Sequence, residues 1–251
     1  MVVRIVAEGA TWISVRPVAQ APLIYTLEDK VAILAMDDGK ANALSDAMIT
    51  ALEEGLGRAE KEARAVVLLG RPERFCAGFD LRAMMASADS AKALLRRGAD
   101  LLMALYGFSL PLVVGCTGHA LAGGALVLLT GDVRIGAEGA YRIGLNEVSI
   151  GLPVPILGLA LARDRLAPTA LGPATLLAQI YEPSEAATVG YLDLVVPPSE
   201  VVARAKAEAQ RLTGLAQPAF SGTKMRLRGK TIEHVFATLE EDMRGLGVPT
   251  A

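Results

Sequence analysis

The 251 residues are 52% apolar and 21% charged, so the chain can bury a large core and is too hydrophobic to be disordered over most of its length. A formal net charge of −2, without a long basic stripe, excludes the electrostatic footprint of a nucleic-acid-binding protein. The two cysteines, Cys76 and Cys116, stand outside any CxxC or histidine-bearing metal spacing. We therefore expect buried thiols in a reducing, cytoplasmic environment, and no metal site.

The first 22 residues alternate weakly in hydropathy and lack the long apolar segment and small-residue cleavage site of a signal peptide. We predict that residues 1–22 form a loose N-terminal extension, with an edge strand in VVRIVAE as the alternative. The rest of the chain is expected to divide into a core at 23–198 and a helical region at 199–251.

Short apolar runs that are typical of buried strands recur through the first half of the chain. They are LIYTL, VAILAM, AVVLLG, PLVVGC and VRIGA, at residues 23–27, 31–36, 65–70, 111–116 and 133–137. Segments with helical periodicity lie between them at 45–63, where Ser45 is a predicted N-cap, at 89–108, and after Gly123. This alternation indicates an α/β layer fold, because each connecting helix has to cover a face of the sheet.

Residues 101–131 contain no Asp, Glu, Lys or Arg, which raises the question of a membrane span. A spanning helix needs ~20 continuous apolar residues. Here the run is broken at Pro111, Gly115, Gly118, Gly123 and Gly124. We therefore predict a buried strand, a loop and a buried helix in this region.

Two glycine-bearing loops each follow an apolar strand and open a helix. Their sequences are RFCAGFDLRAMM at 74–85 and TGHALAGGALVLL at 117–129. Glycine permits tight turns and a close approach of a ligand to the backbone, and a helix start presents unpaired N–H groups. Two such loops that face each other are suited to binding a negative oxygen. Simple close packing of the glycines is the alternative, and the pattern alone does not exclude it.

The segment GLNEVSIGLP at 144–153 contains Glu147, the only formally charged residue between Arg142 and Arg163. The ordinary roles for such a residue are a helix cap, an ion pair with one of these arginines, or exposure at a loop tip. Apolar surroundings would instead raise the pKa of the carboxyl group and suit it to act as a base near neutral pH.

Beyond residue 198 the pattern changes to helices without an intervening strand. One is predicted at 199–214 and a second from Thr223 to Met243. A helical tail of this kind packs either on its own domain or on a neighbouring subunit, and the sequence does not decide between these arrangements.

Four motifs together closely resemble the crotonase superfamily, which comprises the enoyl-CoA hydratases and isomerases. In chain order they are FCAGFDL, GHALAGGALVLLTGDVRI, GLNEVSIGL and EAATVGYLDLVVP. The resemblance runs from about Leu23 to the C-terminus. It implies a spiral of repeated strand–strand–helix units, with C-terminal helices that build a homotrimer or a dimer of trimers. It also implies an acyl-CoA thioester as the substrate, with coenzyme A as its carrier and no separate cofactor.

Functional residues follow from this resemblance position by position. The backbone N–H groups of Phe79 and Gly123 would form an oxyanion hole for the thioester oxygen. Lys40 and Ala41, in the segment DDGKANALS, and Ala77 in the first loop would line the coenzyme A site.

The acyl pocket would be bordered by Met84, Leu126 and Ile156. Family hydratases have two glutamates at the reacting carbon; one position matches Glu147, and the other falls on Leu126, which cannot move a proton. The following segment, LPVPILGLALARDRL, is bulky and apolar where hydratases have a glycine-rich stretch. In both features the sequence is similar to the mitochondrial-type Δ3,Δ2-enoyl-CoA isomerases.

Water addition to a 2-enoyl thioester is most easily pictured with two acid–base groups, whereas moving a double bond needs one base and an oxyanion hole. We therefore predict an isomerase with Glu147 as its base. The alternatives are a hydratase or related lyase that works with Glu147 and water alone, and an acyl-CoA-binding protein without turnover.

The remaining polar residues near these motifs are given structural roles. Asp80 is expected to hold its turn through backbone N–H groups, and His119 to be satisfied by a backbone hydrogen bond. His234 is expected to be solvated. The basic cluster KMRLR at 224–228 would either meet the phosphates of coenzyme A or form a solvated helix face, and we favour the solvated face.

Overall fold

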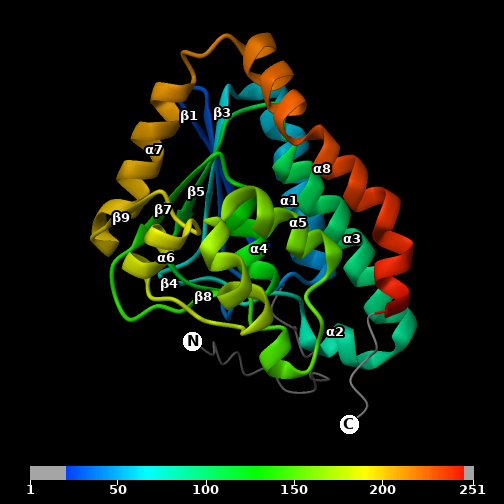
Figure 1. The fold of residues 1–251 in the computed structure, drawn as a ribbon. Coiled ribbons are helices and arrows are strands. Elements are labelled where there is room, and N and C mark those ends of the chain that lie inside the picture. The colour runs from blue at the N-terminus through cyan, green and yellow to red at the C-terminus, as the bar shows by residue number, and fades with distance from the viewer. Residues whose placement is uncertain (1–20, 246–251) are drawn as a thin grey trace, which may run out of the picture.

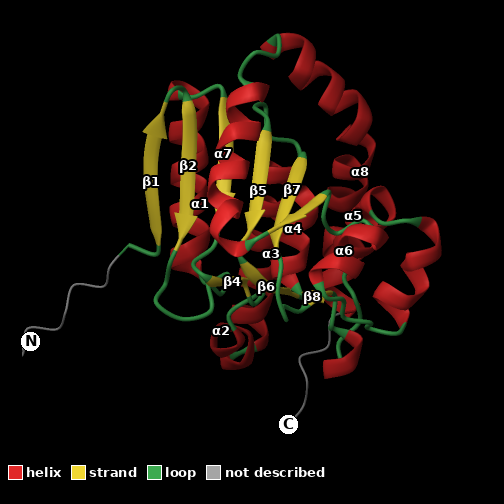
Figure 2. Ribbon diagram, turned by 90° about the vertical axis from the view of Figure 1, so that its left-hand side faces the viewer, coloured by secondary structure: helices red, strands yellow, loops and turns green. Residues whose placement is uncertain are grey.

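The computed structural model describes residues 21–245 and contains two β-sheets (Figures 1 and 2). The larger sheet has six strands, in the spatial order β1 (Leu23–Glu28), β2 (Val31–Met36), β3 (Ala65–Leu69), β5 (Leu112–Cys116), β7 (Val133–Ala137) and β9 (Leu194–Val196). Only β1 runs antiparallel to its neighbour. The smaller sheet is parallel and consists of β4 (Glu73–Cys76), β6 (Gly118–Leu121) and β8 (Ile143–Gly144).

The chain repeats one unit, in which a strand of the larger sheet leads to a strand of the smaller sheet and then to a helix. In the first repeat β3 and β4 are followed by α2 (Leu81–Ala86) and α3 (Ala88–Tyr106). In the next, β5 and β6 lead to α4 (Gly123–Thr130), and β7 and β8 then precede α5 (Ile156–Arg165). This repetition confirms the predicted spiral of strand–strand–helix units.

The other helices cover the sheet or extend the C-terminal region. They are α1 (Asp46–Glu62), α6 (Pro183–Val189), α7 (Val201–Leu212) and α8 (Gln217–Gly245). Short helical turns occur at Val148–Ile150, Pro168–Ala170, Gly172–Leu176 and Pro198–Glu200. The two predicted C-terminal helices are confirmed, although α8 begins six residues before Thr223.

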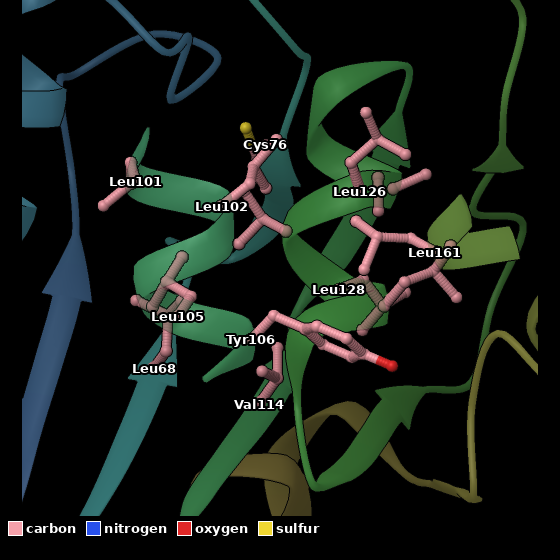
Figure 3. Close-up of a cluster of buried hydrophobic side chains, with 14 of the residues drawn as sticks. Leu68, Cys76, Leu101, Leu102, Leu105, Tyr106, Val114, Leu126, Leu128 and Leu161 are labelled. Carbon is pink, nitrogen blue, oxygen red and sulfur yellow. The ribbon is translucent and has the colours of Figure 1, made fainter. Parts of the chain in front are cut away.

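Both faces of the larger sheet are buried at its central strands β2, β3, β5 and β7, whereas the edge strands β1 and β9 are partly exposed. In β2, Val31 and Ile33 belong to a cluster with Ala205 and Ala209 of α7, whereas alternate residues such as Leu34 belong to the main core. The main core contains side chains of α1, α3, α4, α5 and α8, and Figure 3 shows its centre, where α3 and α4 meet. Burial on both faces explains why these strands read as continuous apolar runs.

A local sequence signal explains where α1 starts. The Ser45 side chain accepts a hydrogen bond from the Met48 N–H at 3.3 Å and caps α1, as predicted. The uncharged stretch 101–131 folds into the end of α3, β5, β6 and α4. No helix within residues 21–245 is long and apolar enough to cross a membrane.

Two parts of the sequence-based picture differ from the structure or lie outside it. The three strands of the smaller sheet are two to four residues long and lie in segments interpreted as loops. VVRIVAE lies outside the described residues, so the edge strand and the extension at 1–22 stay predictions, as do the domain limits at 198 and 199.

Candidate active site

The two glycine-bearing loops lie against each other, because each leaves the same end of an adjacent strand, β4 or β6. Gly78 has a φ of +96°, which favours glycine. A Cβ built on Gly78 would lie 3.1 Å from the Ala122 Cβ and 3.2 Å from the Gly123 nitrogen. The two loops therefore face each other, which is the arrangement that a shared oxyanion site requires.

The backbone around Phe79 directs its N–H group away from Leu44, the residue with which it pairs. Leu44 pairs with Phe79 in a parallel bridge, in which the Leu44 N–H donates to Gly78 O at 2.8 Å and Leu44 O accepts from the Asp80 N–H at 3.3 Å. The Phe79 peptide N–H points to the opposite side. Gly123 is the first residue of α4, so its N–H has no acceptor within the helix. Within residues 21–245 neither N–H donates to another protein atom.

Ala122, which precedes the second of these donors, has an unusual backbone conformation. Its φ of +48° and ψ of −125° are strained for a residue with a Cβ, at a cost of about 1–3 kcal/mol. Two hydrogen bonds hold it there: the Ala122 N–H donates to Gly144 O at 3.0 Å, and Ala122 O accepts from the Leu126 N–H at 3.1 Å. The sharp turn lets α4 begin directly at the site.

Glu147 follows β8 and is only 7% exposed. Its carbonyl oxygen accepts hydrogen bonds from the N–H groups of Ile150 and Leu152, both at 3.0 Å, so the backbone of the loop is fixed. Its carboxylate oxygen Oε2 is buried and has no hydrogen-bond partner within the described residues. Burial is the main cause that raises the pKa of the carboxyl group from 4.5 to about 6.

The ordinary explanations for this acid do not hold. Glu147 precedes the short helix at Val148–Ile150, yet its side chain makes no capping hydrogen bond. Among residues 21–245 it forms no ion pair with Arg142 or Arg163, and it is not exposed. A buried carboxylate with an unpartnered oxygen and a raised pKa is suited to accept and return a proton.

Leu126 lies in the main core and is 1% exposed (Figure 3). Gly158 of α5 approaches it so closely that a Cβ built there would lie 3.4 Å from Leu126 Cδ2. The position where the family pattern has a second acid therefore holds packed hydrocarbon. Of the other predicted pocket residues, Met84 of α2 and Ile156 at the start of α5 are half-buried.

The predicted coenzyme A residues come together at one edge of the glycine-bearing loops. The Ala77 N–H donates to Ala41 O at 3.1 Å, and Arg71 Nη1 donates to Lys40 O at 3.0 Å. Both Lys40 and Ala77 are exposed, so a ligand can reach them.

The segment that carries Lys40 and Ala41 is held by Asn42, whose role the sequence did not indicate. Its buried Nδ2 donates to the carbonyl oxygens of Met36, Arg74 and Phe75, at 3.0, 3.2 and 3.2 Å. These three bonds join the segment to the end of β2 and to β4. The residue type offers one signal for this role: Asn42 has a positive φ of +52°, which asparagine tolerates unusually well.

Several structural roles predicted near the motifs are confirmed. Asp80 caps α2 by accepting from the Arg82 N–H at 2.9 Å, and His119 Nδ1 accepts from the Arg142 N–H at 3.0 Å. His234 is exposed, and both cysteines are buried and free.

The interpretation of the basic cluster at 224–228 as a solvated face is wrong for two of its members. Lys224 and Arg228 are buried and pair with Asp132 at 2.6 and 3.0 Å. Lys224 Nζ also donates to the carbonyl oxygens of Phe108 and Leu110, and its burial lowers its pKa to about 8. These contacts fasten α8 to the core and leave neither side chain free for a phosphate.

Two surface cavities are lined neither by Glu147 nor by the two glycine-bearing loops. One, of about 390 Å³, is lined by Asp29, Lys30, Arg64, Gln210 and Thr213, and the other, of about 370 Å³, lies between α1 and α3. The candidate site is therefore assigned to Glu147 and the glycine-bearing loops rather than to either cavity. Within residues 21–245 no cluster of His, Cys, Asp and Glu could hold a metal ion.

Comparison with known proteins agrees with this geometry. Residues 26–245 match the family described as enoyl-CoA hydratase/isomerase. The human protein enoyl-CoA delta isomerase 1, mitochondrial, is 31% identical over 219 residues, which cover 85% of this chain and 72% of that protein. A probable enoyl-CoA hydratase of Rhodobacter capsulatus is 32% identical over 208 residues, with 80% and 78% covered. The crystal structure of an enoyl-CoA hydratase/isomerase family protein from Pseudomonas syringae superposes with a TM-score of 0.88 at 36% identity, covering 90% of this chain and 98% of that one.

Proposed function

This chain belongs to the enoyl-CoA hydratase/isomerase family, and on that premise we propose that it converts a 3-enoyl-CoA into a 2-enoyl-CoA with Glu147 as its only acid–base group. The observation that carries the proposal is a buried carboxyl group at 147, whose Oε2 has no partner within residues 21–245, together with packed hydrocarbon at position 126. One proton acceptor suffices for a double-bond shift, whereas water addition is easier with two.

The proposed reaction moves one proton along the acyl chain. The thioester oxygen accepts hydrogen bonds from the N–H groups of Phe79 and Gly123. The Glu147 carboxylate removes a proton from C2, and the electron pair of that C–H bond forms the C2–C3 double bond as the C3–C4 electrons shift to C4. In the dienolate the negative charge is shared between C4 and the thioester oxygen, where the two N–H groups stabilise it. Protonated Glu147 then delivers the same proton to C4 and regains its starting charge.

A hydratase that uses Glu147 and water is the second candidate, because the chain is about as similar to the Rhodobacter capsulatus protein as to the human isomerase. The apolar packing around Leu126 argues against it, since no second carboxylate is present there to share the protons of a water molecule. An acyl-CoA-binding protein without turnover is the third.

Separate incubations with 3-enoyl-CoA and 2-enoyl-CoA, followed by the absorbance of the conjugated thioester, distinguish the three candidates. Absorbance that appears from the first substrate and persists with the second supports the isomerase. Loss of 2-enoyl absorbance supports the hydratase. Micromolar acyl-CoA binding with neither reaction would establish the binding protein and contradict both enzymes.

Variants at the two groups test their roles. Glu147→Gln should lower kcat on the order of 10²-fold or more, with little effect on acyl-CoA binding. Gly123→Pro removes the proposed donor and should lower kcat by roughly 10²- to 10³-fold. Gly123→Ala is its matched control, because it adds the same Cβ, 3.1 Å from the Phe79 ring, but keeps the N–H. Equal activity in the two Gly123 variants would show that the donor lies elsewhere.

We also propose that the protein assembles as a homotrimer or dimer of trimers, as the family resemblance implies, and acts in the cytoplasm. Analytical ultracentrifugation of the purified protein would reveal the assembly, and a monomer at micromolar concentration would contradict it.

A further inference from the structure

The aromatic ring of Phe79 lies between two glycines. On one side, a Cβ built on Gly98 of α3 would lie 2.1 Å from Phe79 Cε1 and 2.4 Å from Cζ. On the other side, a Cβ built on Gly123 would lie 3.1 Å from both Cδ2 and Cε2. The ring therefore occupies the space that a side chain at position 98 would need.

Gly98 has no conformational reason to be glycine. It lies inside the 19-residue helix α3, away from both ends, and its φ is not in the left-handed region. Alanine is the better residue inside a helix, so a buried glycine here needs another explanation. Gly57 of α1 provides the contrast, because it is exposed and a Cβ there would have nothing within 4 Å.

The backbone of Phe79 is fixed on the side opposite to its N–H group. Leu44 bonds to Gly78 O and to the Asp80 N–H, which leaves the Phe79 peptide between two anchored neighbours. If a methyl group at position 98 displaces the ring, the ring has little room toward Gly123, because it already lies 3.1 Å from where a Cβ of that residue would be. It has to rotate outward or to pull its own peptide with it.

We infer that Gly98 is a positioning residue for the Phe79 N–H group. Because Gly98 has no side chain, the Phe79 ring can pack directly against α3, and this packing sets the direction of the N–H. The inference rests on the proposed function, in which this N–H binds the thioester oxygen. Gly98 touches neither the substrate nor Glu147 in this scheme and acts only through Phe79.

Gly98→Ala should lower kcat for 3-enoyl-CoA isomerisation by between about 10- and 100-fold, because a small displacement of a catalytic group has effects of this size. KM should change much less, and the pH dependence should stay as in the wild type because Glu147 is untouched. Gly57→Ala, the matched control, should keep the wild-type kcat. A simple loss of helix stability would not produce this split between kcat and KM.

The double variant Phe79→Ala/Gly98→Ala separates positioning from a general packing defect. Phe79→Ala keeps the main-chain N–H and removes the ring with which the new methyl group collides. The double variant should therefore have the kcat of Phe79→Ala alone. If Gly98→Ala keeps the wild-type kcat, or if its loss persists undiminished in the double variant, the inference is overturned.

A spectroscopic measurement tests the effect of Gly98 on the Phe79 N–H without relying on enzymatic activity. The chain has five phenylalanines, so selective 15N-phenylalanine labelling yields a simple amide spectrum. The Phe79 amide signal should shift in Gly98→Ala and stay in place in Gly57→Ala. An unmoved signal overturns the inference whether or not the wild type is active. A wild type without isomerase activity overturns the proposed function, while a moved signal still supports the link from Gly98 to the Phe79 N–H.

Discussion

Replacing Glu147 with glutamine should stabilise the folded protein at neutral pH although it removes the proposed base. The carboxylate is 7% exposed, and its Oε2 has no hydrogen-bond partner within the described residues. Burial raises its pKa from 4.5 to about 6. At 1.36 kcal/mol for each pKa unit, this difference corresponds to about 2 kcal/mol by which ionisation of Glu147 destabilises the folded state. Glutamine keeps the size of the side chain and cannot ionise.

The pH at which the gain appears follows from the direction of this pKa change. Between pH 4.5 and about 6 the folded protein binds more protons at this group than the unfolded chain does, so its free energy of unfolding falls as the pH rises. The cost is fully present above about pH 6 and absent below pH 4.5. Glu147→Gln should therefore gain up to about 2 kcal/mol at pH 7 and nothing below pH 4.5.

Urea unfolding of the wild type and the variant at pH 4 and pH 7 measures this gain. For a domain of this size it corresponds to a rise in Tm of roughly 4–8 °C at pH 7. Glu138→Gln removes an exposed carboxylate at the end of β7 and should change stability by less than about 0.5 kcal/mol.

Two results would refute the reasoning. If Glu147→Gln is no more stable than the wild type at pH 7, the carboxylate is not poorly solvated in the folded protein. If the gain is the same at pH 4 and pH 7, it does not arise from ionisation. Either result removes the physical basis for treating Glu147 as a base with a raised pKa.

Three further outcomes are expected. The kcat/KM for isomerisation should rise with pH through about 6 and level off above it, because Glu147 must be ionised to accept a proton; an initial-rate profile that is flat from pH 5 to 8 would contradict this. Gly124→Ala should lower the free energy of unfolding by at least about 1–3 kcal/mol in urea titrations, because its Cβ would lie 2.0 Å from Cys76 O. Lys224→Met should cost about 1–3 kcal/mol by thermal or urea unfolding, because the partly buried Asp132 loses one of its two cationic partners and the carbonyl oxygens of Phe108 and Leu110 lose a donor.

Matched controls accompany the last two variants. Gly172→Ala adds a Cβ that has nothing within 4 Å and should leave stability almost unchanged. Lys230→Met removes an exposed charge from the same helix as Lys224. If Gly172→Ala loses as much stability as Gly124→Ala, the steric explanation for Gly124→Ala is wrong. If Lys230→Met loses as much as Lys224→Met, the electrostatic explanation for Lys224→Met is wrong.

The sequence by itself determined five of the six strands of the larger sheet and most of the helices around it, but it missed β9, which is only three residues long. Strands such as Val31–Met36 and Ala65–Leu69 are uninterrupted apolar runs, and Ser45 marks the start of α1, so these signals are local. The glycine-bearing loops were also located correctly, because glycine spacing and adjacent apolar runs indicate where a chain turns after a buried strand.

The family resemblance implied a second strand in each repeat, but the residue pattern did not locate these strands of the smaller sheet, because strands of two to four residues carry too little alternation to distinguish them from loops. The burial of Lys224 and Arg228 was missed for a related reason. Helical periodicity indicates which residues share a face, but the partner that neutralises them, Asp132, lies more than 90 residues away in the chain.

For Glu147, the sequence left four roles open: a cap, an ion pair, an exposed acid and a base. Tertiary structure excluded the first three, because the folded chain buries the carboxylate and leaves its Oε2 without a partner within the described residues. The packing of the Phe79 ring against Gly98 likewise depends on tertiary structure. Only the packing of α3 against the first loop shows that Gly98 faces an aromatic ring, since a distance between side chains depends on how the whole chain folds and not on the residues next to either one.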